Sequence, residues 1–349
     1  MSGHVSAVWR HTVSLGPALP SVSAAVRASV AVAVPLALLF AAGRLDWALY
    51  AGFGAFAAVY GRYDGDARRL WLQASAGATI LTAMLLGTAA SAGQFPVAAK
   101  VLVVAVVAWG ANLLSSGLRW APPGPIFSVF AAGACLSVPA TAATFAAVLA
   151  VGGGTVLWCL LLALAIGVAR RGGVQAAEVL AAARLWEPLP HAPGRSLLMG
   201  VAALAAGLGA QLVLGGHWYW ASLAAIAAVT GADAHARVGR GLQRFLGTAV
   251  GVVLAAALFA LDVPAWALLL VAVVFQGLIE LIVLRNYGLA MGLITVVALS
   301  MLHLARPESD AGALLSDRLL ETGLGVLIGI VLSVGLGLIV GARHRRAAA

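Results

Sequence analysis

Long apolar runs recur along the chain, separated by short breaks that contain Pro, Gly or Arg. Most runs approach the ~20 residues that a membrane-spanning helix needs, and they lack the ~10-residue alternation of a transmembrane β-strand. We therefore predict twelve helical spans, at 22–42, 46–61, 70–92, 97–117, 122–138, 142–169, 196–214, 217–232, 243–261, 264–284, 287–304 and 315–341. The segments 46–61, 122–138 and 217–232 are short, so tilted, broken or re-entrant helices are expected there.

Composition supports a bilayer as the solvent of this chain. Hydrophobic residues make up 62% of the 349 positions and charged residues only 9%, against roughly 25% charged in an ordinary soluble domain. The mean hydropathy is +1.02. These values exclude a soluble globular protein and predict an all-α integral membrane protein without a large soluble domain.

The distribution of positive charge predicts the orientation. With the N-terminus in the cytoplasm, sixteen arginines fall on the cytoplasmic side: Arg10, Arg62, Arg68, Arg69, Arg119, Arg170, Arg171, Arg184, Arg195, Arg237, Arg240, Arg244, Arg285, Arg343, Arg345 and Arg346. Only Arg44, Lys100, Arg306 and Arg318 fall on the other side. Because cytoplasmic loops of inner-membrane proteins are enriched in Lys and Arg, a multi-pass cell-membrane protein with both termini cytoplasmic is expected. The net charge of +9 then needs no nucleic-acid partner.

The chain repeats a pattern about 170 residues apart. The first copy consists of Leu45-Asp46-Trp47-Ala48, an Ala- and Gly-rich span, a loop with Arg62, Arg68 and Arg69, and then Gln73 and Gly77. The second consists of His217-Trp218-Tyr219-Trp220-Ala221, a similar span, a loop with Arg237, Arg240 and Arg244, and then Gly247 and Gly251. Because six helices return the chain to its starting side, two parallel six-helix repeats about an axis along the membrane normal are predicted.

This repeat defines the predicted domains. Residues 1–169 form the first six-helix membrane repeat, 170–195 a cytoplasmic linker, and 196–349 the second repeat. The linker is expected to contain a short helix around Val174–Trp186. We expect the run at 22–42 to be an uncleaved first span and not a signal peptide, because the region before it is too long. A central pathway would lie between the repeats.

The second repeat resembles the fusaric-acid-resistance-like family, which is related to aromatic acid exporters and aluminium-activated malate channels. The resemblance rests on Tyr219-Trp220-Ala221 entering a span, Asp233 at its inner end, Arg240-x-x-x-Arg244-x-x-Gly247-Thr248-x-x-Gly251, Arg285-Asn286-Tyr287-Gly288 with Thr295, and Asp317-Arg318 with Thr322-x-x-Gly325. The first repeat keeps Asp46-Trp47 and reduces the Arg-Gly-Thr element to Arg69, Gln73 and Gly77. The resemblance implies export of aromatic or other organic carboxylate anions.

Arginines are the candidate substrate-binding residues, because a guanidinium binds a carboxylate bidentately and stays charged. Arg240 and Arg244 lie one helical turn apart on one face, and Arg69 follows the second span. Arg27 and Arg195 lie at the inner ends of the first helix of each half. An alternative role for all of these is to set topology and to anchor lipid phosphates.

Two carboxylates are proton-coupling candidates. Glu280 lies inside the tenth span, where a charge is costly and has a partner or a role. Asp233 ends the eighth span. The alternatives are ion pairs, of Glu280 with Arg285 and of Asp233 with Arg237.

Trp47, Tyr219 and Trp220 are candidates for lining an aromatic-substrate path, and the alternative is an interfacial aromatic belt.

Enzyme signatures are absent from the sequence, which contains no Walker loop, HExxH or Gly-x-Ser-x-Gly. Cys135 and Cys159 lie in apolar runs and the histidines lack ligand spacing, so neither a metal nor another cofactor is expected. A carrier would use the proton gradient or the membrane potential. A passive organic-anion channel and a non-transport membrane scaffold or accessory subunit stay open as alternatives. The expected partners are the lipid bilayer and a small organic anion, and a homodimer or a membrane partner subunit is left open.

Overall fold

The computed structural model describes residues 16, 21–183, 189, 191–231 and 233–347, and this part of the chain is all helical without a strand. Nine of its helices are long and apolar enough to span a membrane. They are α2 (Val22–Ala41), α4 (Asp66–Ala92), α5 (Val97–Gly117), the continuous stretch of α7 (Ala142–Ala147), a π-helical segment (Val148–Gly153) and α8 (Gly154–Arg171), α10 (Ala192–Val213), α12 (Ala234–Ala260), α13 (Ala265–Ile282), α14 (Tyr287–Ala305) and α15 (Ala311–Ala347). The chain is a multi-pass membrane protein. The predicted cytoplasmic N-terminus, residues 1–15, lies outside the described residues.

Three shorter apolar helices coincide with the three short predicted segments. They are Leu45–Val59, with α3 (Ala48–Ala55) at its centre, α6 (Ile126–Ser137) and α11 (Tyr219–Val229). All 11 residues of α11 are buried. At 1.5 Å per residue this helix is about 16 Å long, well short of a ~30 Å hydrocarbon core. A helix that is apolar all round is stable when other helices surround it, which is the position of α11.

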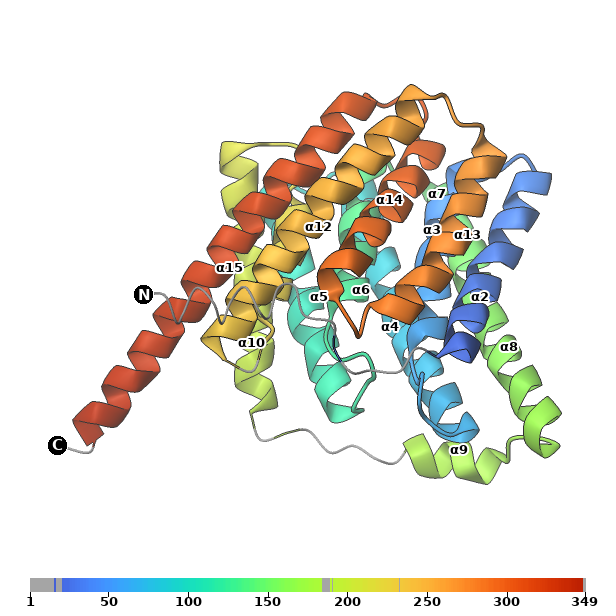
Figure 1. The fold of residues 1–349 in the computed structure, drawn as a ribbon, viewed down its shortest axis with the longest axis horizontal. Helices are drawn as coiled ribbons and strands as arrows, with labels where there is room; N and C mark the ends of the chain where they lie inside the picture. The colour runs from blue at the N-terminus through green and yellow to red at the C-terminus, as the bar shows by residue number, and fades with distance from the viewer. Residues whose placement is uncertain (1–15, 17–20, 184–188, 190, 232, 348–349) are drawn as a thin grey trace.

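Several helix contacts in the first half of the chain have a counterpart in the second half. In the second half α12 packs on α14 and α11 packs on α15 and α10, while in the first half α4 packs on α6 and α3 on α8 and α2. The halves meet most extensively where α2 packs on α13 and α5 packs on α10, and also where α6 packs on α11 and α3 on α14 (Figure 1). The first helix of each half therefore contacts the fourth helix of the other.

The backbone between the third and fourth helices also matches between the halves. α4 and α12 are both 27 residues long. Each is followed by a non-glycine residue with positive φ, Gln94 at 49° and Asp262 at 46°, and then by a proline N-cap, Pro96 or Pro264. A left-handed turn of this kind is uncommon for a non-glycine residue, so its occurrence at equivalent places is a specific likeness.

The predicted linker contains one described helix, α9 (Ala176–Ala183), at the lower edge of the molecule in Figure 1. Its Ala182 carbonyl accepts a hydrogen bond from Arg68 Nη1 at 3.1 Å. The rest of the predicted helix, as far as Trp186, lies outside the described residues.

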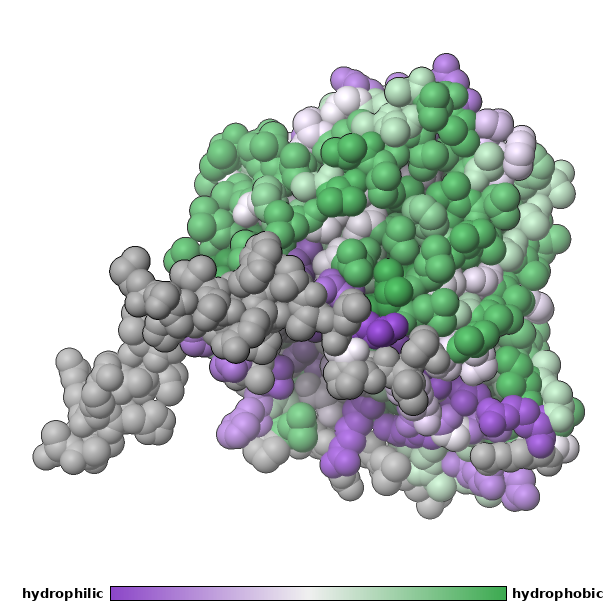
Figure 2. All heavy atoms as spheres, viewed as in Figure 1, coloured by the Kyte–Doolittle hydropathy of each residue, from purple (hydrophilic) through white to green (hydrophobic). Residues whose placement is uncertain are grey.

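The outer surface is apolar where helices face outward. Figure 2 shows a broad hydrophobic band with hydrophilic residues gathered along the lower edge. Large side chains such as Leu212, Val253 and Val331 are exposed. A soluble monomer rarely exposes so continuous an apolar surface, so this band is the lipid-facing belt.

Glycines allow the closest helix contacts. A Cβ on Gly247 or Gly251 would collide with the carbonyl oxygens of α14, and a Cβ on Gly325 would collide with the backbone of Ala221 in α11. At these positions the absence of a side chain lets the helix backbones approach each other.

The substitution Gly325→Ala is expected to lower the Tm of the detergent-purified protein, because α15 must move away from α11. Overpacking of this kind costs about 1–3 kcal/mol. Gly335→Ala on the same helix is the matched control, since a Cβ there meets nothing within 4 Å. Equal Tm values for the two variants would contradict the packing role of Gly325.

Candidate functional site

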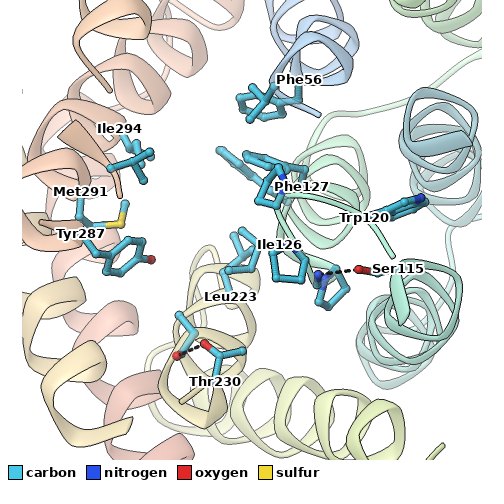
Figure 3. Close-up of a pocket in the computed structure, with 18 of the residues that line it drawn as sticks. Phe56, Ser115, Trp120, Ile126, Phe127, Leu223, Thr230, Tyr287, Met291 and Ile294 are labelled. Carbon is cyan, nitrogen blue, oxygen red and sulfur yellow. Dashed lines mark hydrogen bonds between the residues drawn. The ribbon is translucent and has the colours of Figure 1, made fainter. Parts of the chain in front are cut away.

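A cavity of about 1550 Å³ lies where the two halves meet. It is lined mainly by α3 and α6 from the first half and by α11, α12, α13 and α14 from the second. Figure 3 shows Tyr287, Met291 and Ile294 of α14 facing Phe127 of α6 and Leu223 of α11 across the open space. The volume is sufficient for a drug-sized organic molecule.

The cavity wall combines aromatic side chains with an excess of positive charge. Its aromatic residues are Phe53, Phe56, Tyr60, Tyr63, Trp120, Phe127, Phe130, Trp220 and Tyr287. Its charged residues, among those described, are seven arginines and one carboxylate: Arg62, Arg119, Arg195, Arg237, Arg240, Arg244, Arg318 and Glu280. A cleft lined by one sign of charge with apolar walls concentrates the opposite charge, so this cavity favours anions.

Most of these arginines belong to one end of the cavity. Arg62 follows α3, Arg119 follows α5, and Arg195, Arg237 and Arg240 lie in the first two turns of α10 or α12. Arg119, Arg195 and Arg240 are exposed. These helix ends are the ones predicted to face the cytoplasm, and we call this group the mouth arginines.

Tyr287 connects two of the predicted site arginines. Its hydroxyl accepts a hydrogen bond from Arg244 Nη1 at 2.8 Å, and the Arg240 guanidinium carbon lies 4.6 Å from the centre of its ring. Arg244 is only 3% exposed, and its Nε has no hydrogen-bond partner. The structure thus brings Arg240 and Arg244 to one side chain while leaving donors for a ligand.

Glu280 is the carboxylate of the cavity wall, is buried, and accepts a hydrogen bond from Arg62 Nη2. Its partner is therefore in the loop that follows α3 in the first half and is not Arg285. Arg27 in α2 is also buried and lies within electrostatic range of Glu280, although it does not line the cavity. This group joins α2, α3 and α13 at the interface between the halves.

Arg69 does not line the cavity. It donates to Asp66 Oδ1 at 2.8 Å, to the Asp64 carbonyl at 2.7 Å and, through Nε, to the Gly61 carbonyl at 3.1 Å. In the second half Arg237 Nε donates to the Gly231 carbonyl at 3.3 Å. Arg69 therefore corresponds to Arg237, one turn earlier than Arg240, and both close the loop before the third helix.

The other predicted site residues lie in varied surroundings. Asp233 is exposed and caps α12 by accepting from Ala236 N at 2.8 Å. Trp47 lies under the Arg44 guanidinium, 3.3 Å from the ring centre, and outside the cavity. Tyr219 is buried beside Gly133 without lining the cavity, whereas Trp220 is both buried and part of its wall.

Sequence reasoning did not single out Arg62 or Tyr287 as site residues. Arg62 shares the loop that contains Arg69, and Tyr287 belongs to the Arg285-Asn286-Tyr287-Gly288 run, so both had a sequence signal. Arg318 was assigned to the side opposite the mouth, yet it is 1% exposed and lines the cavity.

Part of the chain matches a known protein family. Residues 197–332 match the family "Fusaric acid resistance protein-like". The match starts in α10 and ends in α15, so it includes Arg240, Arg244, Glu280 and Arg318.

One relative is the "Uncharacterized membrane protein YvaC" of Bacillus subtilis strain 168. The two sequences are 29% identical over 137 residues, which is 39% of this chain and 22% of the relative. The match thus spans about a fifth of the relative's length. No solved structure matches the chain.

A double-mutant cycle is expected to detect the Arg62–Glu280 pair. Arg62→Gln and Glu280→Gln should each lower the free energy of unfolding, because each leaves a buried charge without its partner. The double variant should lose less than the sum of the two, by about 0.5–3 kcal/mol. Strictly additive losses, measured as Tm shifts in detergent, would mean that the two side chains do not interact.

Proposed function

We propose that this protein exports organic carboxylate anions, aromatic carboxylates in particular, through the cavity between its halves. The observation that carries the proposal is the cavity wall, where seven arginines outnumber a carboxylate that already has a partner. Guanidinium groups bind carboxylates by charge-assisted hydrogen bonds, and the aromatic wall residues bury an organic ring. The family description of residues 197–332 supports this reading.

The proposed architecture is twelve spans in two six-helix units, 1–169 and 196–349, joined by the linker 170–195. Nine long helices and three short ones would make up the twelve. The reciprocal contacts of α2 with α13 and of α5 with α10 support a two-fold axis between the units. An even number of spans in each unit makes this axis parallel to the membrane normal, with the cavity on it.

The proposed setting is the cell membrane with the mouth arginines facing the cytoplasm, as the positive-inside rule requires. In this orientation the arginines collect anions from the cytoplasm. The inside-negative membrane potential then drives each negative charge outward with ~2.3 kcal/mol per 100 mV. Export of an anion is therefore downhill in the proposed orientation.

Glu280 is the proposed coupling site for protons. A proton on Glu280 would free Arg62 for the substrate carboxylate, and loss of that proton would return Arg62 to Glu280. Protonation of Glu280 and binding of the substrate to Arg62 thus favour each other, so proton and substrate would cross together. Asp233, an exposed helix cap at the mouth, is the second candidate.

Replacing Arg240 and Arg244 together with Gln is expected to lower benzoate flux in proteoliposomes at least tenfold, because each loses a charge-assisted bond worth about 1.5–3 kcal/mol. Arg285→Gln is the matched control, since Arg285 is exposed near the same end and does not line the cavity. Unchanged flux in the double variant would assign these arginines to topology or lipid anchoring. If wild-type protein carries no flux of any aromatic acid, the exporter proposal fails and a scaffold is favoured.

A proton gradient in the same direction as the benzoate flux is expected to accelerate that flux in wild-type proteoliposomes at a clamped membrane potential. Glu280→Gln should remove this acceleration while leaving potential-driven flux, because the amide cannot take up a proton. Identical gradient dependence in both proteins would exclude Glu280 as the coupling site. Flux that neither saturates nor responds to the gradient in the wild type would instead indicate a passive channel.

A further inference from the structure

α15 contributes to the cavity a buried arginine, Arg318, that has no role in the export steps proposed above. Arg318 lies two turns into α15, is 1% exposed, and lines the cavity. α15 runs in the direction opposite to α10 and α12 (Figure 1), so Arg318, near its start, lies at the end of the cavity away from the mouth arginines. The connection before α15 was predicted to lie on the outer side of the membrane.

The contacts of Arg318 leave much of its guanidinium unsatisfied. Its Nη2 donates to Thr295 Oγ1 at 3.3 Å, and its Cζ lies 3.9 Å from the centre of the Trp220 ring. Its Nε and Nη1 have no hydrogen-bond partner. Arginine stays charged in proteins, and a buried charge without hydrogen bonds is costly. The guanidinium therefore has strong donors available to an anion that enters the cavity.

A second buried arginine, Arg244, makes an anion near Arg318 more favourable still. Arg244 is buried in the same wall, its Nε also lacks a partner, and its charge acts on Arg318. The carboxyl group of Glu321, one turn after Arg318, is fully buried and makes no hydrogen bond to Arg318. Two like charges repel strongly where water is scarce, and an anion between them offsets the repulsion.

We propose that Arg318 and Arg244 form a deep anion subsite in the part of the cavity away from the mouth. This subsite holds the carboxylate of the transported molecule. The proposal rests on the export function above and adds the residues that select the substrate. Trp220, Phe130 and Met291 belong to the same wall, and the rings of Phe130 and Trp220 lie 4.9 Å apart. An organic ring gains from burial against these side chains, whereas a hydrated inorganic anion does not. The subsite therefore selects aromatic carboxylates over chloride.

The test is calorimetric titration of the purified full-length protein with sodium benzoate and, separately, with sodium chloride. Wild-type protein should bind benzoate more tightly than chloride. Arg318→Gln should weaken benzoate binding at least tenfold, and Arg318→Lys, which keeps a charge in the site and so protects folding, should weaken it by a smaller factor. Glu321→Gln is the control, because it removes the neighbouring carboxyl and should leave benzoate affinity unchanged or higher.

Each alternative result overturns a distinct statement. Wild-type affinity in Arg318→Gln and Arg318→Lys, together with weaker binding in Arg240→Gln, would overturn the deep subsite and leave the export function standing. Equal affinity for chloride and benzoate would overturn the selection of carboxylates. Equal loss of benzoate binding in Glu321→Gln and Arg318→Gln would make Arg318 a structural partner of Glu321. If wild-type protein neither binds nor transports benzoate, the export function fails with the subsite.

Discussion

The contacts of α2 with α13 and of α5 with α10 are the most extensive between the two halves of the protein, and residues of all four helices line the cavity between the halves. Each contact contains a polar link inside the membrane part of the protein. Asn112 Nδ2 donates to Ser196 Oγ at 2.8 Å, and Ser29 Oγ donates to the Val273 carbonyl at 3.1 Å. In apolar surroundings such bonds add to close packing as a source of helix association. Between them, the short helices α3, α6 and α11 leave room that longer helices would fill.

The arginines fall into two groups according to how their charge is satisfied. Arg69 and Arg237 donate to backbone carbonyls of the loops that precede their helices, so they fix the loop shape. Arg244 and Arg318 keep nitrogens without partners although both are buried. Burial without compensation is unfavourable for a folded protein, and it persists where a ligand supplies the missing acceptor. Arg27 Nε also lacks a partner, so Arg244 and Arg318 are distinguished by this contrast together with their place in the cavity wall.

Much of the fold was predictable because hydropathy depends on sequence directly. The long spans and the three short ones occur near their predicted positions. Among the site residues, Arg195, Arg240, Arg244, Glu280 and Trp220 line the cavity. Arg27, Arg69 and Trp47 were equally good candidates by sequence, but they do not line the cavity. Which side of a helix faces the other half depends on how the halves pack, and the sequence of one half does not show this.

The sequence by itself determined that this is a helical membrane protein, where its apolar segments lie, and which arginines follow which spans. These properties arise from local composition and from the length of helix that a bilayer requires. Only the tertiary structure decided that Arg62 meets Glu280 across 218 positions of chain and that Arg318 lies in the cavity with Arg244. Hydrophobic residues face lipid and protein alike, so hydropathy does not specify which helices touch. Packing between the halves makes that choice, and with it creates the space in which an anion can be held.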